Sequence, residues 1–306
     1  MKTTSKKQIM QATWLAAMLV IGSANAQAEG ITGNVGGKLL ASGNGLMLLS
    51  AAGEVEWQQS TGLTHDAWLL ANGNIMYADG DSVTEVTRDH KVVFEYKSTE
   101  KRGGGTYACQ RLANGNTMIG ENSTGKVLEV DPAGKVVFEL QTSPATVGEH
   151  HNMRMARKLK NGNYLVCHSG AHIVKEYTPK GEVVLELKTP NIAFSAIRTA
   201  AGTTLVGSLD KIMEFDAKGK VVWEFSTKDI PGVSIRNMTG INLLPNGNIV
   251  TGCYSAYDNN EGCGLLEITR DKKLVWRLSN PKLGGSMMAV QKLSADGKPL
   301  PGDCQR

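Results

Sequence analysis

The sequence predicts an all-β fold: a six-bladed β-propeller of four-stranded antiparallel blades, with the first blade completed by a strand from the C-terminus. Three observations favour it. A turn motif recurs at blade-sized spacing, four short apolar runs occupy each repeat, and the 306 residues include 35 Gly, with 41% hydrophobic and 20% charged residues. This composition suits a globular chain with many tight turns and argues against disorder or a coiled coil. Because one repeat runs through the whole chain, we expect a single domain.

The repeated turn reads Leu-x-Asn-Gly-Asn in four copies and Thr-Ala-Ala-Gly-Thr in a fifth, degenerate copy. It lies between two apolar runs, which is a strong hairpin signal. From each turn glycine to the next the steps are 42, 47, 40 and 45 residues. The five glycines are Gly73, Gly115, Gly162, Gly202 and Gly247. We expect the first strand of a blade before each turn and the second strand after it. Four strands in a repeat of this length are typical of a propeller blade.

The third and fourth strands of each repeat also share positions. The third strands carry a recurrent glutamate, at Glu85, Glu129, Glu176, Glu214 and Glu267. The fourth strands begin at Val92, Val136, Val183, Val221 and Leu274. One fourth-strand position is aromatic in five blades, as Trp57, Phe94, Phe138, Trp223 and Trp276. Because these residues recur, we interpret the glutamates as surface or inter-blade positions and the aromatic residues as packing between sheets.

The two ends of the repeat region complement each other. Residues 38–57 match only strands two to four of a blade, whereas residues 286–293 match a first strand and are followed by a turn at Gly297, 50 residues after Gly247. We therefore expect the C-terminal strand to complete the first blade. Such closure removes sheet edges that would otherwise invite aggregation.

The N-terminus predicts export. Residues 1–28 combine lysines, a short apolar stretch and small residues, as in a secretory signal peptide, and we expect cleavage after Ala26 or Ala28. The propeller would then span 29–306, in the periplasm or outside the cell, with no transmembrane segment. Removing Lys2, Lys6 and Lys7 leaves 30 basic against 29 acidic residues, a net charge of +1. A nucleic-acid partner is therefore not expected, and we expect a monomer.

Export also permits disulfides. Cys253 and Cys263 bracket a Gly/Asn-rich loop and are the pair that we expect to be bonded. The pairing of Cys109, Cys167 and Cys304 stays open, and an odd count leaves at least one thiol free or intermolecular.

Candidate functional residues gather on one face of the predicted propeller. First strands line the central channel, and function is sought where residues depart from the repeat. Five of six histidines map to the face formed by loops that enter the first strands and loops that join strands two and three: His65, His150, His151, His168 and His172. His65, Tyr107 and Arg154 each lie eight residues before a turn glycine. Asn152, Arg236 and Asn237 are expected just above them.

These side chains offer many donors and few acceptors, which suits an anion. We expect a sulfated or carboxylated small molecule or a glycan as the ligand. His65, His151 and Tyr107 are the predicted catalytic groups, because imidazoles act as acids, bases or nucleophiles near neutral pH. Ligand binding is predicted for His150, Asn152, Arg154, His168, His172, Arg236 and Asn237. In the plainer interpretation, these groups only bind neighbouring loops and line a water-filled channel.

Other chemistry receives less support. His168 and His172, with His150 and His151, could bind a transition metal, but no HExxH or paired CxxC supports this. No metal or other cofactor is therefore predicted. Asp66, Asp79, Asp81 and Glu121 also reach this face and leave a glycosidase pair conceivable.

The repeat from Leu112 to Glu139 resembles the exported six-bladed propellers of the quinoprotein-like and arylsulfotransferase-like group. The resemblance covers most of residues 37–300, and His150, His151 and Asn152 at the channel are its more specific part. It implies that His65 or His151 carries sulfate transiently. Asn152, Arg154, His168 and Arg236 would then bind the sulfate. Within residues 1–306 we expect no counterpart of the additional N-terminal domain of the arylsulfate sulfotransferases.

Three functions remain open. The first is a sulfotransferase-like enzyme. The second is a polysaccharide lyase, in which Arg154 or Arg236 neutralises a uronate carboxylate while Tyr107 or a histidine moves the proton. The third is a non-catalytic propeller that binds a glycan or a partner protein.

Overall fold

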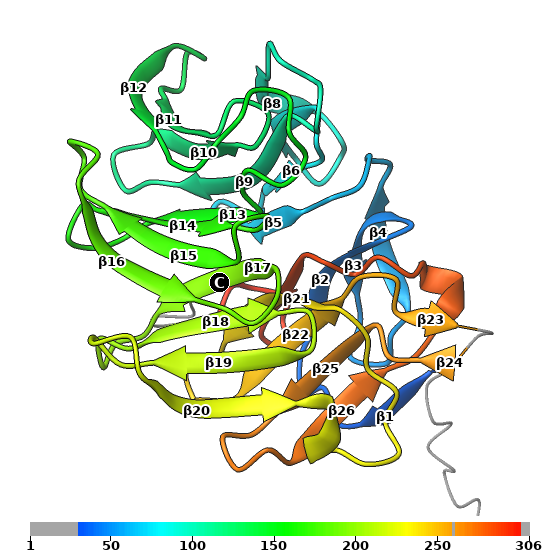
Figure 1. Ribbon diagram of the computed structural model, residues 1–306. Coiled ribbons are helices and arrows are strands. Elements are labelled where there is room, and N and C mark those ends of the chain that lie inside the picture. Colours follow the sequence, from blue (N-terminus) through cyan, green and yellow to red (C-terminus); the bar gives the residue numbers. More distant parts are fainter. Residues whose placement is uncertain (1–29, 259–260, 301–306) are drawn as a thin grey trace, which may run out of the picture.

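The computed structural model describes residues 30–258 and 261–300 and confirms the six-bladed propeller. Figure 1 shows the blades following one another around the molecule in chain order. The predicted signal peptide and Cys304 lie outside the described residues. No helix in the described ranges is long and apolar enough to cross a membrane.

Blades two to five each contain four consecutive strands, hydrogen-bonded in antiparallel order from the channel outwards. Blade two contains β5 (Asp66–Leu69), β6 (Ile75–Ala78), β7 (Ser82–Val86) and β8 (Val92–Lys97). Blade three contains β9 (Thr106–Arg111), β10 (Thr117–Glu121), β11 (Lys126–Val130) and β12 (Val136–Gln141). Blade four contains β13 (Met155–Lys158), β14 (Tyr164–His168), β15 (Ile173–Tyr177) and β16 (Val183–Lys188). Blade five contains β17 (Ala193–Arg198), β18 (Thr204–Ser208), β19 (Lys211–Phe215) and β20 (Val221–Ser226).

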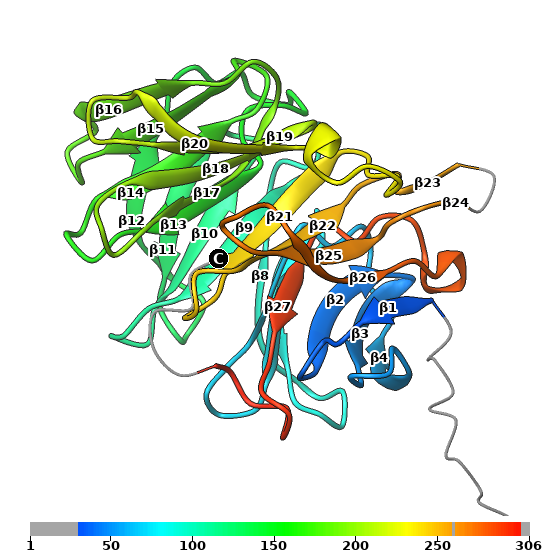
Figure 2. The same cartoon turned by 90° about the horizontal axis from the view of Figure 1, so that it is seen from below.

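Blades one and six contain the two ends of the described chain. Blade one contains β27 (Val290–Lys292), β2 (Leu39–Gly43), β3 (Gly45–Leu49) and β4 (Val55–Gln59), as predicted. Blade six contains β21 (Met238–Leu243), β22 (Ile249–Cys253), β25 (Leu265–Ile268), β26 (Leu274–Leu278) and, as an unpredicted fifth strand, β1 (Ile31–Gly33). Figure 2 shows β27 beside β2, and β1 against β26. The remaining elements are the hairpin of β23 (Tyr257–Asp258) and β24 (Glu261–Gly262), with two 3-10 turns, η1 (Thr227–Asp229) and η2 (Pro281–Leu283).

The repeated turns form as the sequence predicts. In blade two, the N–H of Leu70 donates to the carbonyl of Asn74 at 2.8 Å, and the N–H of Gly73 donates to the carbonyl of Leu70 at 3.0 Å. Gly73 has a φ of 85°, which side chains disfavour, so glycine is required there. The side-chain oxygen of Asn72 accepts from the N–H of Asn74 at 3.0 Å.

The core lies between the blades. Six clusters of buried apolar side chains in the described residues each join two neighbouring blades. The recurrent glutamates are buried and are inter-blade groups, as one of the two interpretations holds. Each pairs with a basic side chain of the next blade: Glu85 with Arg111, Glu129 with Lys158, Glu176 with Arg198, Glu214 with Arg270, and Glu267 with Lys292. The last of these pairs ties β27 to blade six.

The predicted Cys253–Cys263 disulfide is wrong for this structure, in which both residues are free and buried. Both belong to the apolar cluster between blades five and six. The sulfur of Cys263 lies 3.1 Å from the carbonyl oxygen of Leu265. Burial raises the pKa of Cys263 to about 12, so its thiol is protonated and unreactive at neutral pH.

Candidate functional site

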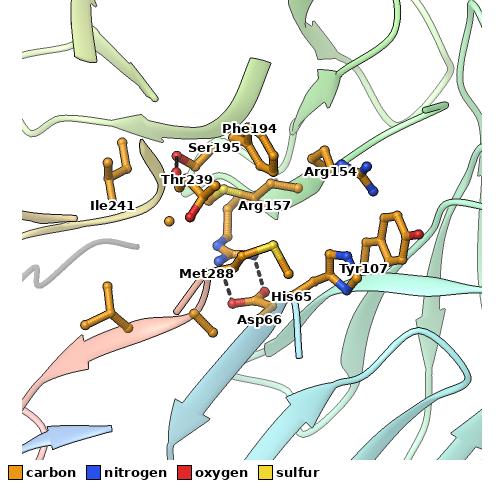
Figure 3. A pocket seen from close by; sticks show the side chains of 14 residues that line it. His65, Asp66, Tyr107, Arg154, Arg157, Phe194, Ser195, Thr239, Ile241 and Met288 are labelled. Carbon is orange, nitrogen blue, oxygen red and sulfur yellow. Dashed lines mark hydrogen bonds and ion pairs between the residues drawn. The ribbon is translucent and has the colours of Figure 1, made fainter. Parts of the chain in front are cut away.

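One residue from each blade surrounds the channel at the same level. Each lies eight positions before the turn glycine of its blade, as the positions of those glycines show. The six residues are His65, Tyr107, Arg154, Phe194, Thr239 and Ala289. All six line a cavity of about 30 Å³ inside the channel (Figure 3). The spacing that the sequence reveals in three blades therefore holds in all six.

The ring is chemically divided. Blades two, three and four contribute His65, Tyr107 and Arg154, whereas blades five, six and one contribute Phe194, Thr239 and Ala289. Phe194, Thr239 and Ala289 were not predicted as site residues, because a phenylalanine, threonine or alanine at the start of a strand is ordinary. The signal that could have found them was the eight-residue offset itself.

Two arginines line the cavity, and their surroundings differ. Arg157 makes a bidentate ion pair with Asp66, with its two terminal nitrogens 2.7 and 3.0 Å from the carboxylate oxygens. The carboxylate also accepts from the backbone N–H of Cys109 at 3.0 Å. Figure 3 shows this pair in the channel. Asp66 is therefore a neutralised structural group rather than a free glycosidase carboxylate.

Arg154 has no such partner. It is 8% exposed, and its described contacts include no carboxylate. Its Nη2 lies 2.8 Å from Nε2 of His150 and 3.3 Å from Nδ1 of His151, while its Nε and Nη1 are buried without a hydrogen-bond partner. The guanidinium lies over the ring of Tyr107 at 4.8 Å. A buried cation without a counter-charge is costly, and this makes Arg154 the strongest anion-binding candidate.

The hydrogen bonds of Arg154 set the tautomer of His150. An arginine only donates, so Nε2 of His150 must accept and carries no proton. The proton is then on Nδ1, which lies 3.0 Å from the carbonyl oxygen of Gly103 and 2.9 Å from the hydroxyl of Tyr107. The same reasoning places an accepting Nδ1 on His151. Both imidazoles are exposed at the channel mouth and are neutral in this arrangement.

The pKa shifts agree with this assignment. Partial burial, followed by the charge of Arg154, lowers the pKa of His150 and of His151. The same two causes lower the pKa of His65 to about 3. The ring of His65 stacks on Tyr107, with 3.7 Å between centroids, and its Nδ1 is buried without a partner. Burial raises the pKa of Tyr107, which keeps its proton at neutral pH.

The side chains of two predicted ligand-binding residues instead make hydrogen bonds within the fold. The side chain of Asn152 binds the backbone N–H and the carbonyl of Thr146 and the carbonyl of Asn122. His168 is fully buried, with Nδ1 3.1 Å from the carbonyl oxygen of Asn152 and Nε2 2.7 Å from the hydroxyl of Tyr177. Both ring nitrogens are satisfied, so His168 and Asn152 hold the loop that carries His150 and His151.

The other predicted residues lie further out. His172 is exposed in the loop between β14 and β15, close enough to His151 for its charge to lower the pKa of that residue. Arg236 is exposed, and Asn237 uses its side-chain amide to donate to the carbonyl of Tyr254 at 3.0 Å. No group of three or more His, Cys, Asp or Glu side chains suitable for a metal occurs in the part of the chain that the structure describes.

Comparison with known proteins supports the fold. No family model matches the sequence, and no match to a curated protein was found. Among solved structures, a protein of unknown function from Bacteroides caccae has a TM-score of 0.73 and 20% identity, covering 85% of this chain and 98% of its own. A streptogramin B lyase has a TM-score of 0.56 and 14% identity, covering 82% of each chain. Virginiamycin B lyase from Staphylococcus aureus has a TM-score of 0.54 and 10% identity, covering 82% of this chain and 98% of its own.

Proposed function

We propose that the channel mouth binds a carboxylate-bearing substrate through Arg154 and that the protein is a lyase acting by proton abstraction. The observation that carries the proposal is the buried guanidinium of Arg154, which lacks a carboxylate partner and is bounded by neutral imidazoles. A cation beside neutral bases suits removal of a proton next to a carboxylate, because the cation stabilises the negative charge that develops.

Substrate binding would also prepare the base. A carboxylate arriving from the mouth competes with His150 and His151 for the N–H groups on Nη2 of Arg154. Displacing His151 frees the lone pair of its Nδ1, which lies 3.3 Å from Nη2 of Arg154, the nitrogen that the carboxylate would then bind. The freed nitrogen then lies near the carbon next to the carboxylate. His151 is the proposed base, because no other hydrogen bond holds its ring, whereas Gly103 and Tyr107 hold His150.

The proposed reaction is a β-elimination. His151 takes the proton from the carbon next to the carboxylate, and the electron pair of that C–H bond forms a carbon–carbon double bond. The C–O bond at the neighbouring carbon breaks, and its electron pair leaves with the oxygen. The hydroxyl of Tyr107, which lies 2.9 Å from Nδ1 of His150, protonates that oxygen. The proton that His151 has taken returns to Tyr107 through solvent after the products leave. The products are an unsaturated carboxylate and an alcohol.

Two further considerations support a lyase over sulfuryl transfer. A sulfuryl group on His65 would have to reach a nitrogen, yet Nδ1 of His65 is buried beside a cavity of only about 30 Å³. Three of the solved structures with this fold are named as lyases, and one of the three is a catalytically inactive virginiamycin B lyase in which a histidine is replaced by alanine. At sequence identities of 10 to 14%, these structures support the fold alone, and they serve only to suggest which substrates to test.

The test has a binding arm and a catalytic arm. Titration with uronate monosaccharides and their methyl esters should show binding of the acid but not of the ester. Arg154→Gln should weaken binding about 10- to 100-fold, the value of one charge-assisted hydrogen-bonded pair. Arg102→Gln is the matched control, because Arg102 is an exposed arginine of a neighbouring loop that is paired with Glu100.

The catalytic arm follows the absorbance of new conjugated double bonds with uronate oligosaccharides and with virginiamycin B. Nitrophenyl sulfate with phenol tests the sulfotransferase prediction. His151→Gln should lower the rate of elimination about 10²- to 10⁴-fold, whereas His90→Gln on the opposite face should not change it. Carboxylate binding without turnover of any substrate would leave a binding propeller. Equal carboxylate affinity in wild type and Arg154→Gln would refute the proposal.

A further inference from the structure

The charges that line the channel cavity do not cancel. The charged groups of its lining are Arg154, Arg157 and Asp66, and their sum is +1 when the imidazole of His65 is neutral. Arg157 and Asp66 neutralise each other at 2.7 Å. The excess positive charge therefore belongs to Arg154, which is 8% exposed. One monovalent anion would balance it.

Unused donors point to the same cavity. An arginine carries five N–H groups, and those of Nη2 face His150 and His151 at the mouth. Nε and Nη1 are buried and have no partner, and Nδ1 of His65 is in the same state. These three nitrogens belong to two residues of the channel ring, His65 of blade two and Arg154 of blade four, which both contact the ring of Tyr107 between them and both line the cavity.

The other polar side chains of the lining are already used. The hydroxyl of Ser195 donates to the carbonyl of Thr239 at 2.6 Å, and the hydroxyl of Thr239 donates to the carbonyl of Gly252 at 3.0 Å. Asp66 is held by Arg157. A ligand beside Arg154 would therefore meet N–H donors that lack acceptors, next to the apolar side chains of Phe194 and Met288.

Size restricts the ligand. The cavity volume is about 30 Å³. Since a water needs about 10–15 Å³ on this measure, the cavity holds about two waters. A chloride ion, somewhat larger than a water, fits this space. A sulfate or a phosphate, each with five heavy atoms, is larger than this space.

We propose that this cavity is a halide site, in which one chloride ion accepts hydrogen bonds from Nη1 of Arg154 and from Nδ1 of His65. The ion lies on the inner side of the guanidinium, whereas the proposed substrate meets Nη2 from the mouth. The inference therefore does not depend on the proposed function. It identifies the resting counter-ion of a cation that the fold buries.

The first experiment measures thermal unfolding of the mature protein without substrate, with sodium chloride replacing sodium fluoride at constant ionic strength. Fluoride is the reference because it is more strongly hydrated than chloride and costs more to bury. We expect Tm to rise with chloride, by about 2–3 °C at a concentration ten times Kd. Arg154→Met should abolish the dependence on chloride, and Arg102→Met should retain it. A second experiment locates the ion, since a crystal soaked in sodium bromide should show an anomalous peak beside Nη1 of Arg154.

Two results would overturn the halide site: equal dependence of Tm on chloride in wild type and Arg154→Met, or bromide peaks elsewhere but none in the cavity. The failure of the two proposals is distinguishable. If uronates do not bind but chloride raises Tm through Arg154, the lyase proposal fails and the halide site stands. If uronates bind through Arg154 and bromide is absent from the cavity, the reverse holds.

Discussion

Arg154 and Arg157 enter the channel from the same strand region but should respond in opposite ways to the same substitution. Arg157→Met removes the partner of Asp66, a residue that is 7% exposed and whose carboxylate would keep only the hydrogen bond from the N–H of Cys109. Stranding a buried charge costs about 3–5 kcal/mol of folding free energy. The substitution also removes the cation–π contact with Trp68 at 5.1 Å, so we expect the upper part of that range.

Arg154→Met removes a cation that has no carboxylate partner and two nitrogens that have no acceptor. The losses are hydrogen bonds to two exposed imidazoles and the contact with the Tyr107 ring at 4.8 Å. These losses are offset by relief of the buried charge. In chloride-free buffer we therefore expect unfolding free energy to change by no more than about 1 kcal/mol, in either direction.

Urea unfolding followed by tryptophan fluorescence at pH 7.5 gives the free energy of unfolding of both variants. An unchanged m-value would show that the surface exposed on unfolding is the same as in the wild type. Arg157→Met should lose at least about 2 kcal/mol more than Arg154→Met. Adding Asp66→Asn to Arg157→Met should recover part of the loss, because the stranded charge is gone. Equal losses in the two single variants would show that Arg154 is compensated and would refute the reasoning behind both proposals.

Three further predictions concern stability and reactivity. Burial lowers the pKa of His168 to about 4, so the unfolded chain binds the proton more readily than the folded one. The contribution of His168 to stability should thus be complete above pH 6.5 and fall by about 1.4 kcal/mol per pH unit between pH 6.5 and 4, so urea titrations should find the slope over this range smaller by that amount in His168→Gln. Glu267→Ala should leave Lys292 without its ion-pair partner where β27 closes the ring, and should lower the free energy of unfolding by about 3–5 kcal/mol. In this variant, amide hydrogen exchange should be faster in β27 than in β9. Cys109, Cys167, Cys253 and Cys263 should react with a thiol reagent only after unfolding, and two fewer thiols in the unfolded chain would indicate the Cys253–Cys263 disulfide.

Most of the fold was predictable because the same pattern of strands and turns recurs five times along the sequence. The starts of the fourth strands at Val92, Val136, Val183, Val221 and Leu274 coincide with the observed ones. Strand β1 was not predictable. It has three residues and matches no position of the repeat, and its place is set by the free edge of β26 rather than by its own sequence.

The candidate site was predictable in position but not in detail. Counting from the turn glycines places His65, Tyr107 and Arg154 at one level of the channel. Which arginine is neutralised depends on Asp66, which lies 91 residues from Arg157 in sequence. Likewise, residue type alone cannot show that both ring nitrogens of His168 are already bound inside the fold. Such pairings arise from tertiary structure, and no spacing in the sequence reveals them.

The closure of blade one has a kinetic consequence. Blades two to five are hairpins whose strands meet over short stretches of chain, whereas Ser42 accepts from the N–H of Ala289 across 247 positions. Contacts of such high sequence separation form late, because the entropy of closing the loop is lost before they contribute. Ala289 and Met288 also line the channel cavity. The cavity is therefore completed only at the last step of folding, and local opening of the C-terminal strand would expose the inner face of Arg154 before the rest of the ring unfolds.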